Sequence, residues 1–376
     1  MMAEMENYDF VNKVIFVNPD IWIPRLFVHR GEVVRTSSGV AGKFFPCKRS
    51  SNVWGYTPLR FLPLKARFAK LKRIESQIAL RVIRQLNSDM PYILFMNSPN
   101  INSPYLLDEL LKGAALSIFD FSDDFVELVH IKERKEFFLR NITKYAQAAD
   151  IVLTVNDHLK NKYSFLNPNI HVVRNATNYN NFDRKSYNPV VFLEKIKSTK
   201  MPIIGYSGLA NASRIDFGLL DFLIEKRPDW QFVFVGPSDS VFVQRFLHYS
   251  NVYHQSPVDY KVLPDYIRYF DAAFVPFEIN EHTKGNDLLK FHDYLAMGKP
   301  VVSTDIGGAA QIKNVIQVAN TPSEFMRSLD RAITSNSDEE VSKRKNVALK
   351  NSWSNRIREV EEFITFSIRS SISVKE

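Results

Sequence analysis

The chain has 376 residues and a mass of 43.5 kDa, which is too long for one ordinary domain core and favours two domains. Its composition, 45% hydrophobic and 24% charged, excludes a disordered or low-complexity protein, because such chains lack the apolar mass that offsets the ordering entropy. Forty-nine Lys and Arg against 41 Asp and Glu give a net charge of +8, which predicts an anionic partner. The single cysteine, Cys47, excludes an internal disulfide and a cysteine-based zinc site.

The first half of the chain alternates short apolar runs with amphipathic segments. Strands are predicted at 14–17, 92–96, 116–119 and 151–154, and helices at 65–87, 104–112, 132–149 and 156–163. Uninterrupted apolar strands that are joined through helices indicate a parallel sheet buried on both faces. The Asn-rich stretch 175–190 that follows is predicted to be an interdomain linker.

A second alternating series fills the remainder. Strands are predicted at 203–206, 232–235, 272–275, 301–303 and 315–318, and helices at 216–227, 259–269, 287–297 and 321–334. We therefore expect an N-terminal domain at 1–174, a C-terminal domain at 191–350, and a last helix at 351–376 that packs back towards the N-terminal domain. Two such α/β halves bind ligands between them, at the carboxyl ends of their sheets.

The excess positive charge is concentrated in one segment, 43–84. Glu75 is its only acid, and its basic residues are Lys43, Lys48, Arg49, Arg60, Lys65, Arg67, Lys70, Lys72, Arg73, Arg81 and Arg84. Apolar residues recur among them with helical spacing, at Leu64, Phe68, Leu71, Ile74 and Ile78. Three interpretations remain open: a core helix with a solvated basic face, attachment to an anionic bilayer, and, ranked last, nucleic-acid binding.

The densest group of polar side chains lies at 276–300, where a strand leads through a loop into a helix expected to begin near Asp287. The free N–H groups of a helix N-terminus attract phosphate. Lys284 and Lys290 would add the positive charge that a diphosphate requires, and the carboxylate of Asp293 would accept hydrogen bonds from ribose hydroxyls. The plainer interpretation is a capped surface loop.

Two further features lie at the carboxyl ends of predicted strands, where we expect a ligand to bind. Gly208 and Gly236 follow predicted strands, where glycine lets the backbone approach a ligand, although neither forms a recognised phosphate motif. In the first half, Asp120, Asp123 and Asp124 follow a strand. Clustered carboxylates can yield a general base, but Asp123 or Asp124 could equally cap a helix. The eight histidines show no metal-ligand spacing.

Together these segments resemble the GT-B glycosyltransferases that use nucleotide sugars, in particular the bacterial group that builds teichuronic acid, capsule and other exopolysaccharides. The resemblance extends over most of the chain, and the segments that carry it are 120–124, 167–169, 174–176, 204–209, 216–220, 226–237, 276–302 and 351–353. The resemblance implies two Rossmann-like domains that face each other across a cleft. It also implies transfer of a sugar, usually from a uridine diphosphate donor, to a lipid-linked or glycan hydroxyl.

The resemblance also assigns residues. It places Lys284, Asn286 and Lys290 on the diphosphate and donor sugar, Asp293 on the ribose, and Gly208, Gly236 and Pro257 in loops that line the nucleotide. Basic side chains and a helix N-terminus stabilise the leaving diphosphate in this fold, so neither a metal nor another cofactor is expected. The acidic N-terminus lacks a signal peptide, and no apolar run approaches membrane-spanning length. We therefore expect a cytoplasmic protein on the inner membrane face, attached through 43–84, without a nucleic-acid partner.

The sequence departs from the family at two places. Glycine, at Gly285, occupies the first acidic position of the family's Glu-x7-Glu motif. If the enzyme inverts the sugar instead, it needs a general base, for which Asp123 is the first choice and Asp124 the second. About twelve residues precede the first predicted strand, too few for the family's opening strand, loop and helix, so an upstream extension is predicted. A UDP-sugar epimerase of the same fold and a catalytically inactive binding protein remain alternatives.

Overall fold

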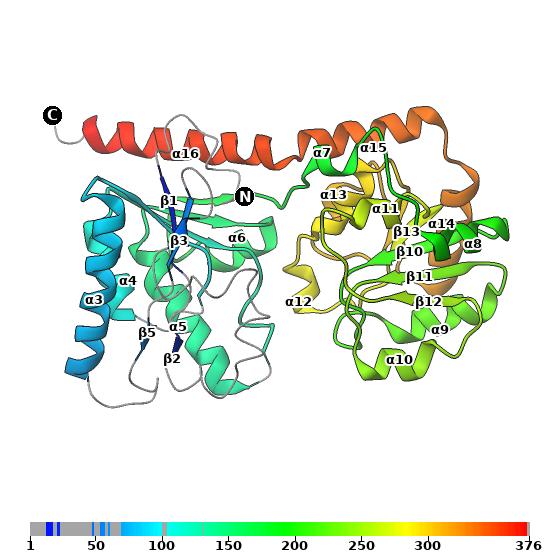
Figure 1. Ribbon diagram of the computed structural model, residues 1–376, viewed down its shortest axis with the longest axis horizontal. Coiled ribbons are helices and arrows are strands. Elements are labelled where there is room, and N and C mark those ends of the chain that lie inside the picture. The colour runs from blue at the N-terminus through cyan, green and yellow to red at the C-terminus, as the bar shows by residue number, and fades with distance from the viewer. Residues whose placement is uncertain are drawn as a thin grey trace.

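The computed structural model describes residues 13–17, 21–22, 47–48, 53–56, 59–60, 69–99, 104–129 and 131–373. Two α/β halves lie side by side, and the last helix runs along the first of them (Figure 1). Residues 1–12 and much of the basic segment, including Lys43, Arg49, Lys65 and Arg67, lie outside the described residues. None of the described helices has the length and apolar character needed to cross a membrane.

The N-terminal half is built on a parallel sheet in the order β6-β7-β8-β9. Its strands are β6 (Ile93–Met96), β7 (Leu116–Phe121), β8 (Ile151–Thr154) and β9 (Ile170–Val172). Four helices accompany them: α3 (Ala69–Asn87), α4 (Pro104–Gly113), α5 (Lys132–Ala148) and α6 (Asp157–Tyr163). Earlier residues form β1 (Val14–Val17), β4 (Val53–Tyr56) and β3 (Cys47–Lys48), and the separate pair β2 (Ile21–Trp22) and β5 (Leu59–Arg60).

The C-terminal half contains a six-stranded parallel sheet in the order β12-β11-β10-β13-β14-β15. The strands are β10 (Ile203–Ser207), β11 (Gln231–Val235), β12 (Val252–Gln255), β13 (Ala272–Val275), β14 (Val301–Ser303) and β15 (Gln317–Val318). The helices up to β13 are α7 (Tyr179–Phe182), α8 (Val191–Ser198), α9 (Phe217–Lys226), α10 (Ser240–Phe246) and α11 (Leu263–Ile267). The later ones are α12 (Glu281–Lys284), α13 (Leu289–Ala296), α14 (Pro322–Thr334), α15 (Asp338–Lys350) and α16 (Trp353–Ser373).

Most predicted elements are present, with corrected ends. The helix expected to begin near Asp287 begins at Leu289, the one expected over 259–269 covers only Leu263–Ile267, and the last strand covers Gln317–Val318 rather than 315–318. Elements that the apolar pattern did not reveal are short or largely polar: β2, β3, β4, β5, β9, β12, α7, α8, α10, α12 and α15. The predicted linker 175–190 contains α7 and the buried Phe182, so packing fixes its path.

The final helix α16 belongs to the core of the N-terminal half although it follows the C-terminal half in sequence. Val360 and Ile364 on α16 pack with Ile118 of β7 and with Ile151 and Leu153 of β8. All five side chains are buried. Burial of an aliphatic side chain stabilises the folded state by about 1.5–3 kcal/mol. These contacts therefore hold α16 against the N-terminal sheet.

This packing predicts that Ile364→Ala lowers the free energy of unfolding of the N-terminal half by about 2–4 kcal/mol, because it opens a cavity under β7 and β8. Phe366→Ala is the control, since Phe366 is 73% exposed on the same helix and its loss is expected to cost less than about 0.5 kcal/mol. Urea denaturation followed by circular dichroism measures both. Equal midpoints for the two variants would contradict the packing described here.

Candidate active site

The strand order of the C-terminal sheet determines where a ligand would bind. The chain leaves β10 towards β11 on one side and later continues through β13 on the other, so the order reverses between β10 and β13. In open α/β sheets, ligands bind outside the carboxyl ends of the strands at such a switch point. Here those ends are marked by Gly208, which follows β10, and by Phe277, which follows β13.

Two glycines bring the backbone close together at this edge. Gly208 and Gly236 have φ angles of +127° and +140°, which side-chain-bearing residues rarely adopt. A Cβ on Gly236 would lie 2.5 Å from the carbonyl oxygen of Gly208, and a Cβ on Gly208 would lie 2.9 Å from Nζ of Lys290. The structure thus brings together three of the predicted donor-binding residues: Gly208, Gly236 and Lys290.

Lys290 lies in the first turn of α13, and its ammonium rests on aromatic rings. Its Nζ donates to the hydroxyl of Tyr206 at 2.8 Å and lies 4.0 Å and 4.9 Å from the ring centres of Tyr206 and Phe277. Burial and the charge of Arg214 hold the pKa of Lys290 well below its usual range. Its hydrogen bond goes to a neutral phenol, and the charge of Asp293 offsets the fall in pKa only in part, so an anion beside Gly208 would add countercharge to this site.

Arg214 is a residue that the sequence analysis missed. It lies in the turn between β10 and α9, and its main-chain carbonyl accepts from the N–H of Glu278 at 2.8 Å. Burial raises the pKa of Asp123, which comes from the other half of the molecule, and the charge of Arg214 partly offsets that rise. The sequence did offer a signal for Arg214: it is a basic residue shortly after Gly208 and just before Asp216, the N-cap of α9.

The start of α13 adds a third source of positive potential. Its N-cap residue, Leu288, offers no side-chain acceptor, so no capping side chain occupies the first free N–H groups of the helix. The helix is tied to β10 through Tyr294, whose hydroxyl accepts from the main-chain N–H of Ser207 at 2.7 Å. Lys290 and the helix start are therefore held at the carboxyl end of β10.

Asp293 lies one turn beyond Lys290 but is enclosed by protein. One of its carboxylate oxygens accepts hydrogen bonds from the hydroxyls of Thr177 and Tyr260, both at 2.7 Å. Burial raises the pKa of Asp293 to about 7, although these hydrogen bonds and Lys290 oppose the rise. In this arrangement Asp293 joins α13 to the segment after β9 and to the loop after β12.

The acidic cluster of the N-terminal half reaches the same region. Asp124 is buried and forms an ion pair with Lys162 at 2.6 Å, whereas burial raises the pKa of Asp123 to about 6. A Cβ at Gly285 would lie 3.0 Å from the Cβ of Asp124. The family's first acidic position therefore has little room for a side chain, and the neighbouring carboxylates come from the opposite half instead.

The remaining predicted residues are placed differently. The ammonium of Lys284 is exposed and pairs with Glu281 at 2.8 Å, rather than joining Lys290. Asn286 is buried, and its carbonyl oxygen accepts from the side-chain amide of Asn156 at 3.3 Å. Pro257 lies in the exposed loop after β12. Among the described residues no group of three potential metal ligands occurs.

His282 on α12 was also missed by the sequence analysis. Both of its ring nitrogens are buried without a hydrogen-bond partner in the structure. Burial and the charge of Arg214 lower its pKa, while Asp124 and Glu127 oppose that shift. It therefore provides a neutral donor and acceptor between the acidic cluster and Arg214.

Comparison with known proteins agrees with this geometry. Residues 202–335 match the family described as glycosyl transferases group 1. The matched residues run from just before β10 to just after α14, within the C-terminal half. The chain is also similar to the "Putative teichuronic acid biosynthesis glycosyltransferase TuaH" of Bacillus subtilis (strain 168), at 24% identity over 243 residues. That similarity covers 60% of this chain, and the chain covers 60% of the relative's length.

Solved structures establish the fold. Anabaena Alr3699/HepE in complex with UDP and glucose superposes with a TM-score of 0.62 at 12% identity, covering 84% of this chain and 86% of that one. Sucrose-phosphate synthase from Thermosynechococcus elongatus gives 0.61 at 13% identity over 86% of each chain. The E. coli trehalose-6-phosphate protein bound with UDP-2-fluoro glucose gives 0.61 at 12% identity, covering 93% and 98%. The chain has the GT-B fold, as the sequence predicted.

Proposed function

We propose that this protein is a glycosyltransferase that moves a sugar from a uridine diphosphate donor to a hydroxyl acceptor. One observation carries the proposal: the ammonium of Lys290 lies beneath Gly208 at the sheet's switch point, where it donates to the neutral hydroxyl of Tyr206. The glycosyltransferase group 1 domain supports this interpretation. So do the UDP and the UDP-2-fluoro glucose that are bound to two proteins of the same fold.

In this proposal the diphosphate lies against Gly208 and Gly236, where the absence of side chains leaves the backbone accessible. Lys290, Arg214 and the start of α13 stabilise the negative charge that develops as the bond from the sugar to the diphosphate breaks. Charges placed in advance in a partly buried site act more strongly than they would in water. These cations supply the charge that a metal ion provides in other transferases, so we propose a reaction that uses no metal.

Asp123 is proposed as the general base that removes the proton from the acceptor hydroxyl. It comes from the half that does not hold the donor residues, so we propose that it faces the sugar from the side away from the diphosphate, and its raised pKa suits proton abstraction near neutral pH. Asp124, the second choice, is already engaged with Lys162 and Tyr163. Asp124 is therefore better suited to position its neighbour than to exchange protons.

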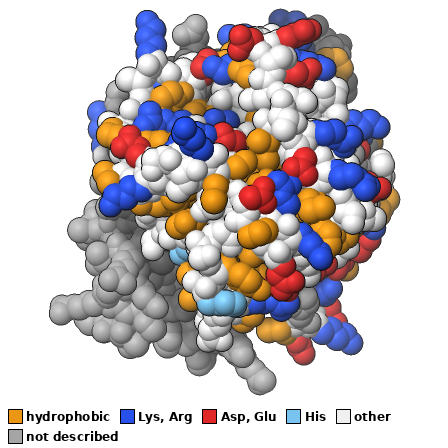
Figure 2. Space-filling view, turned by 90° about the vertical axis from the view of Figure 1, so that its right-hand side faces the viewer, with side chains coloured by type: hydrophobic (Ala, Val, Ile, Leu, Met, Phe, Trp, Pro, Cys, Tyr) orange, Lys and Arg blue, Asp and Glu red, His pale blue; other side chains and the backbone are white. Residues whose placement is uncertain are grey.

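We propose surface polysaccharide assembly as the setting, with a lipid-linked or glycan acceptor at the inner membrane face. The relative in Bacillus subtilis, named for teichuronic acid biosynthesis, supports this setting. Leu71, Ile74 and Ile78 on α3 are 46–54% exposed and lie among Lys70, Arg73 and Arg81, a combination that suits an anionic bilayer surface. On the outer face of the C-terminal half, basic and acidic side chains alternate instead (Figure 2).

The diphosphate site predicts that Lys290→Ala weakens UDP binding about 10- to 100-fold, the cost of one charge-assisted hydrogen bond of about 1.5–3 kcal/mol. Lys284→Ala is the matched control and is expected to have a smaller effect, because that ammonium pairs with Glu281. Isothermal titration calorimetry with UDP measures both. Unchanged binding in Lys290→Ala would remove this residue from the site.

The same calorimetry tests the protonation of Lys290. The pKa of Lys290 is depressed in the free protein, and a bound diphosphate would raise it, so at pH values between these two pKa values binding takes up a proton and the affinity falls as the pH rises. The measured heat should therefore vary with the ionisation enthalpy of the buffer. A heat independent of the buffer would show that Lys290 is already charged in the free protein.

The general base predicts that Asp123→Asn reduces sugar transfer about 10²- to 10⁴-fold while UDP binding stays within twofold. In the unmodified protein, transfer should increase as the pH rises through about 6, because only the ionised carboxylate accepts a proton. A panel of UDP-sugars with and without lipid-linked acceptors provides the assay. Unchanged transfer by Asp123→Asn, or free sugar released at full rate without acceptor, would contradict the assignment.

The membrane proposal predicts that Ile74→Glu reduces binding to vesicles containing anionic phospholipid at least fivefold, because a buried carboxylate opposes both apolar insertion and Coulomb attraction. Phe366→Glu is the control, since Phe366 is equally apolar and 73% exposed but lies on α16. Co-sedimentation with anionic and zwitterionic vesicles measures the difference. Equal losses in the two variants would show that α3 is not the contact.

A further inference from the structure

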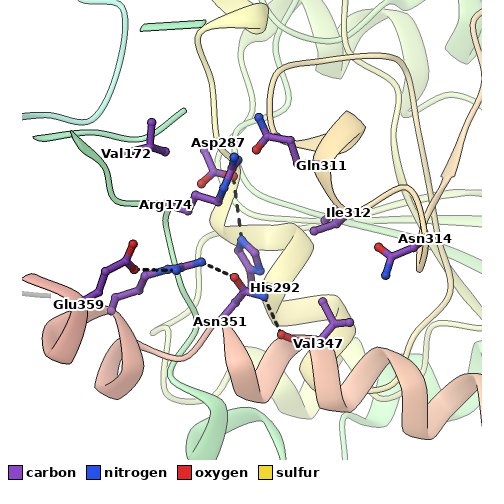
Figure 3. Close-up of a pocket in the computed structure, with 12 residues that line it drawn as sticks. Val172, Arg174, Asp287, His292, Gln311, Ile312, Asn314, Val347, Asn351 and Glu359 are labelled. Carbon is purple, nitrogen blue, oxygen red and sulfur yellow. Dashed lines mark hydrogen bonds and ion pairs between the residues drawn. The ribbon is translucent and has the colours of Figure 1, made fainter. Parts of the chain in front are cut away.

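A second cavity of about 270 Å³ lies where the two halves join α16 (Figure 3). Arg174 from the end of β9, His292 from α13, and Arg356 and Glu359 from α16 line it. The loop after β14 contributes Asn314. We call this cavity the hinge pocket, because its walls come from both halves and from the helix that connects them.

The hinge pocket is separate from the proposed donor site. His292 and Lys290 are two residues apart on α13, so they point to nearly opposite sides of a helix that turns about 100° per residue. The chain just before α13 is fixed to the N-terminal half by two hydrogen bonds. Asn156 donates to the carbonyl of Asn286 at 3.3 Å, and the carboxylate of Asp287 accepts from the N–H of Asn175 at 2.8 Å.

His292 leaves unsatisfied hydrogen-bonding capacity in the pocket. The residue is 2% exposed, and neither ring nitrogen has a partner in the structure. Burial and the charges of Arg356 and Arg174 lower the pKa of His292 to about 3, so the ring is neutral and offers one donor and one acceptor. Nε of Arg356 is likewise buried without a partner. Since buried polar groups normally have partners, these side chains are suited to hydrogen-bond a ligand in the pocket.

The charges of the pocket are already balanced. Arg356 pairs with Glu359 and Arg174 pairs with Asp157, both at 2.9 Å. An anion would therefore compete with existing carboxylates and would also face Asp287, whose oxygen lies 4.0 Å from Nε2 of His292. A ligand with neutral groups that both donate and accept suits His292 and Nε of Arg356 better.

We propose that the hinge pocket binds a neutral polyhydroxylated ligand, a single monosaccharide ring, through His292, Arg356 and Asn314. Hydroxyl groups donate and accept at once, as the neutral imidazole requires. The volume falls just below the range of about 300–1,000 Å³ typical of drug-sized ligands, so the pocket suits one sugar ring and excludes a nucleotide sugar. A ligand here touches both halves and α16, so it stabilises their present arrangement.

The proposal is independent of transferase activity and is tested on binding alone. Saturation-transfer-difference NMR with the full chain would use glucose, galactose and N-acetylglucosamine as probes. Asn314→Phe should abolish the transfer signal by filling the pocket from its exposed rim, whereas Lys313→Phe, an exposed neighbour outside the lining, should retain it. His292→Leu should also lose the signal, and His292→Gln, which keeps a donor and an acceptor, should recover it.

Lys290→Ala separates the hinge pocket from the donor site. The monosaccharide signal should persist in this variant, even if the protein proves not to bind UDP. Loss of the signal in Lys290→Ala, its persistence in Asn314→Phe, or no signal from any of the three sugars would overturn the proposal. Binding of inorganic phosphate that Asn314→Phe abolishes, without any sugar binding, would show that the pocket selects anions instead.

Discussion

The arrangement of the site depends on one contact: the ammonium of Lys290 lies on the rings of Tyr206 and Phe277, beneath a glycine that has no room for a side chain. Aromatic faces attract a cation but do not neutralise it. The cost of burying this charge lowers the pKa of Lys290, and Arg214 lowers it further. A bound anion would reduce that cost, and this is the physical reason for proposing a diphosphate at the carboxyl end of β10.

Helix α13 connects this contact to the rest of the molecule. One side of the helix carries Lys290, and Asp293 on the next turn ties it to Thr177 and Tyr260. Another side presents His292 to the hinge pocket. The loop before the helix contacts the N-terminal half through Asn156 and Asn175. A movement of α13 would therefore alter the proposed donor site, the hinge pocket and the junction of the halves together.

The sequence predicted the fold and part of the candidate site. Apolar strands such as β8 and β11 are buried throughout, so their composition alone identifies them. β12 is largely half-buried at the edge of the sheet and gave no such signal. Gly208, Gly236 and Lys290 follow from their positions after strands and in a helix. Arg214 and His292 do not, because their importance comes from contacts between segments far apart in sequence.

The central claim is that a nucleotide diphosphate binds at the switch point against Lys290. A crystal structure of the full chain with UDP tests it most directly. The diphosphate should lie beside Gly208 and Gly236. Nζ of Lys290 and the guanidinium of Arg214 should lie within hydrogen-bonding distance of its oxygens. A diphosphate bound elsewhere, in the hinge pocket or on Lys284 with Lys290 still resting on Tyr206, would contradict it.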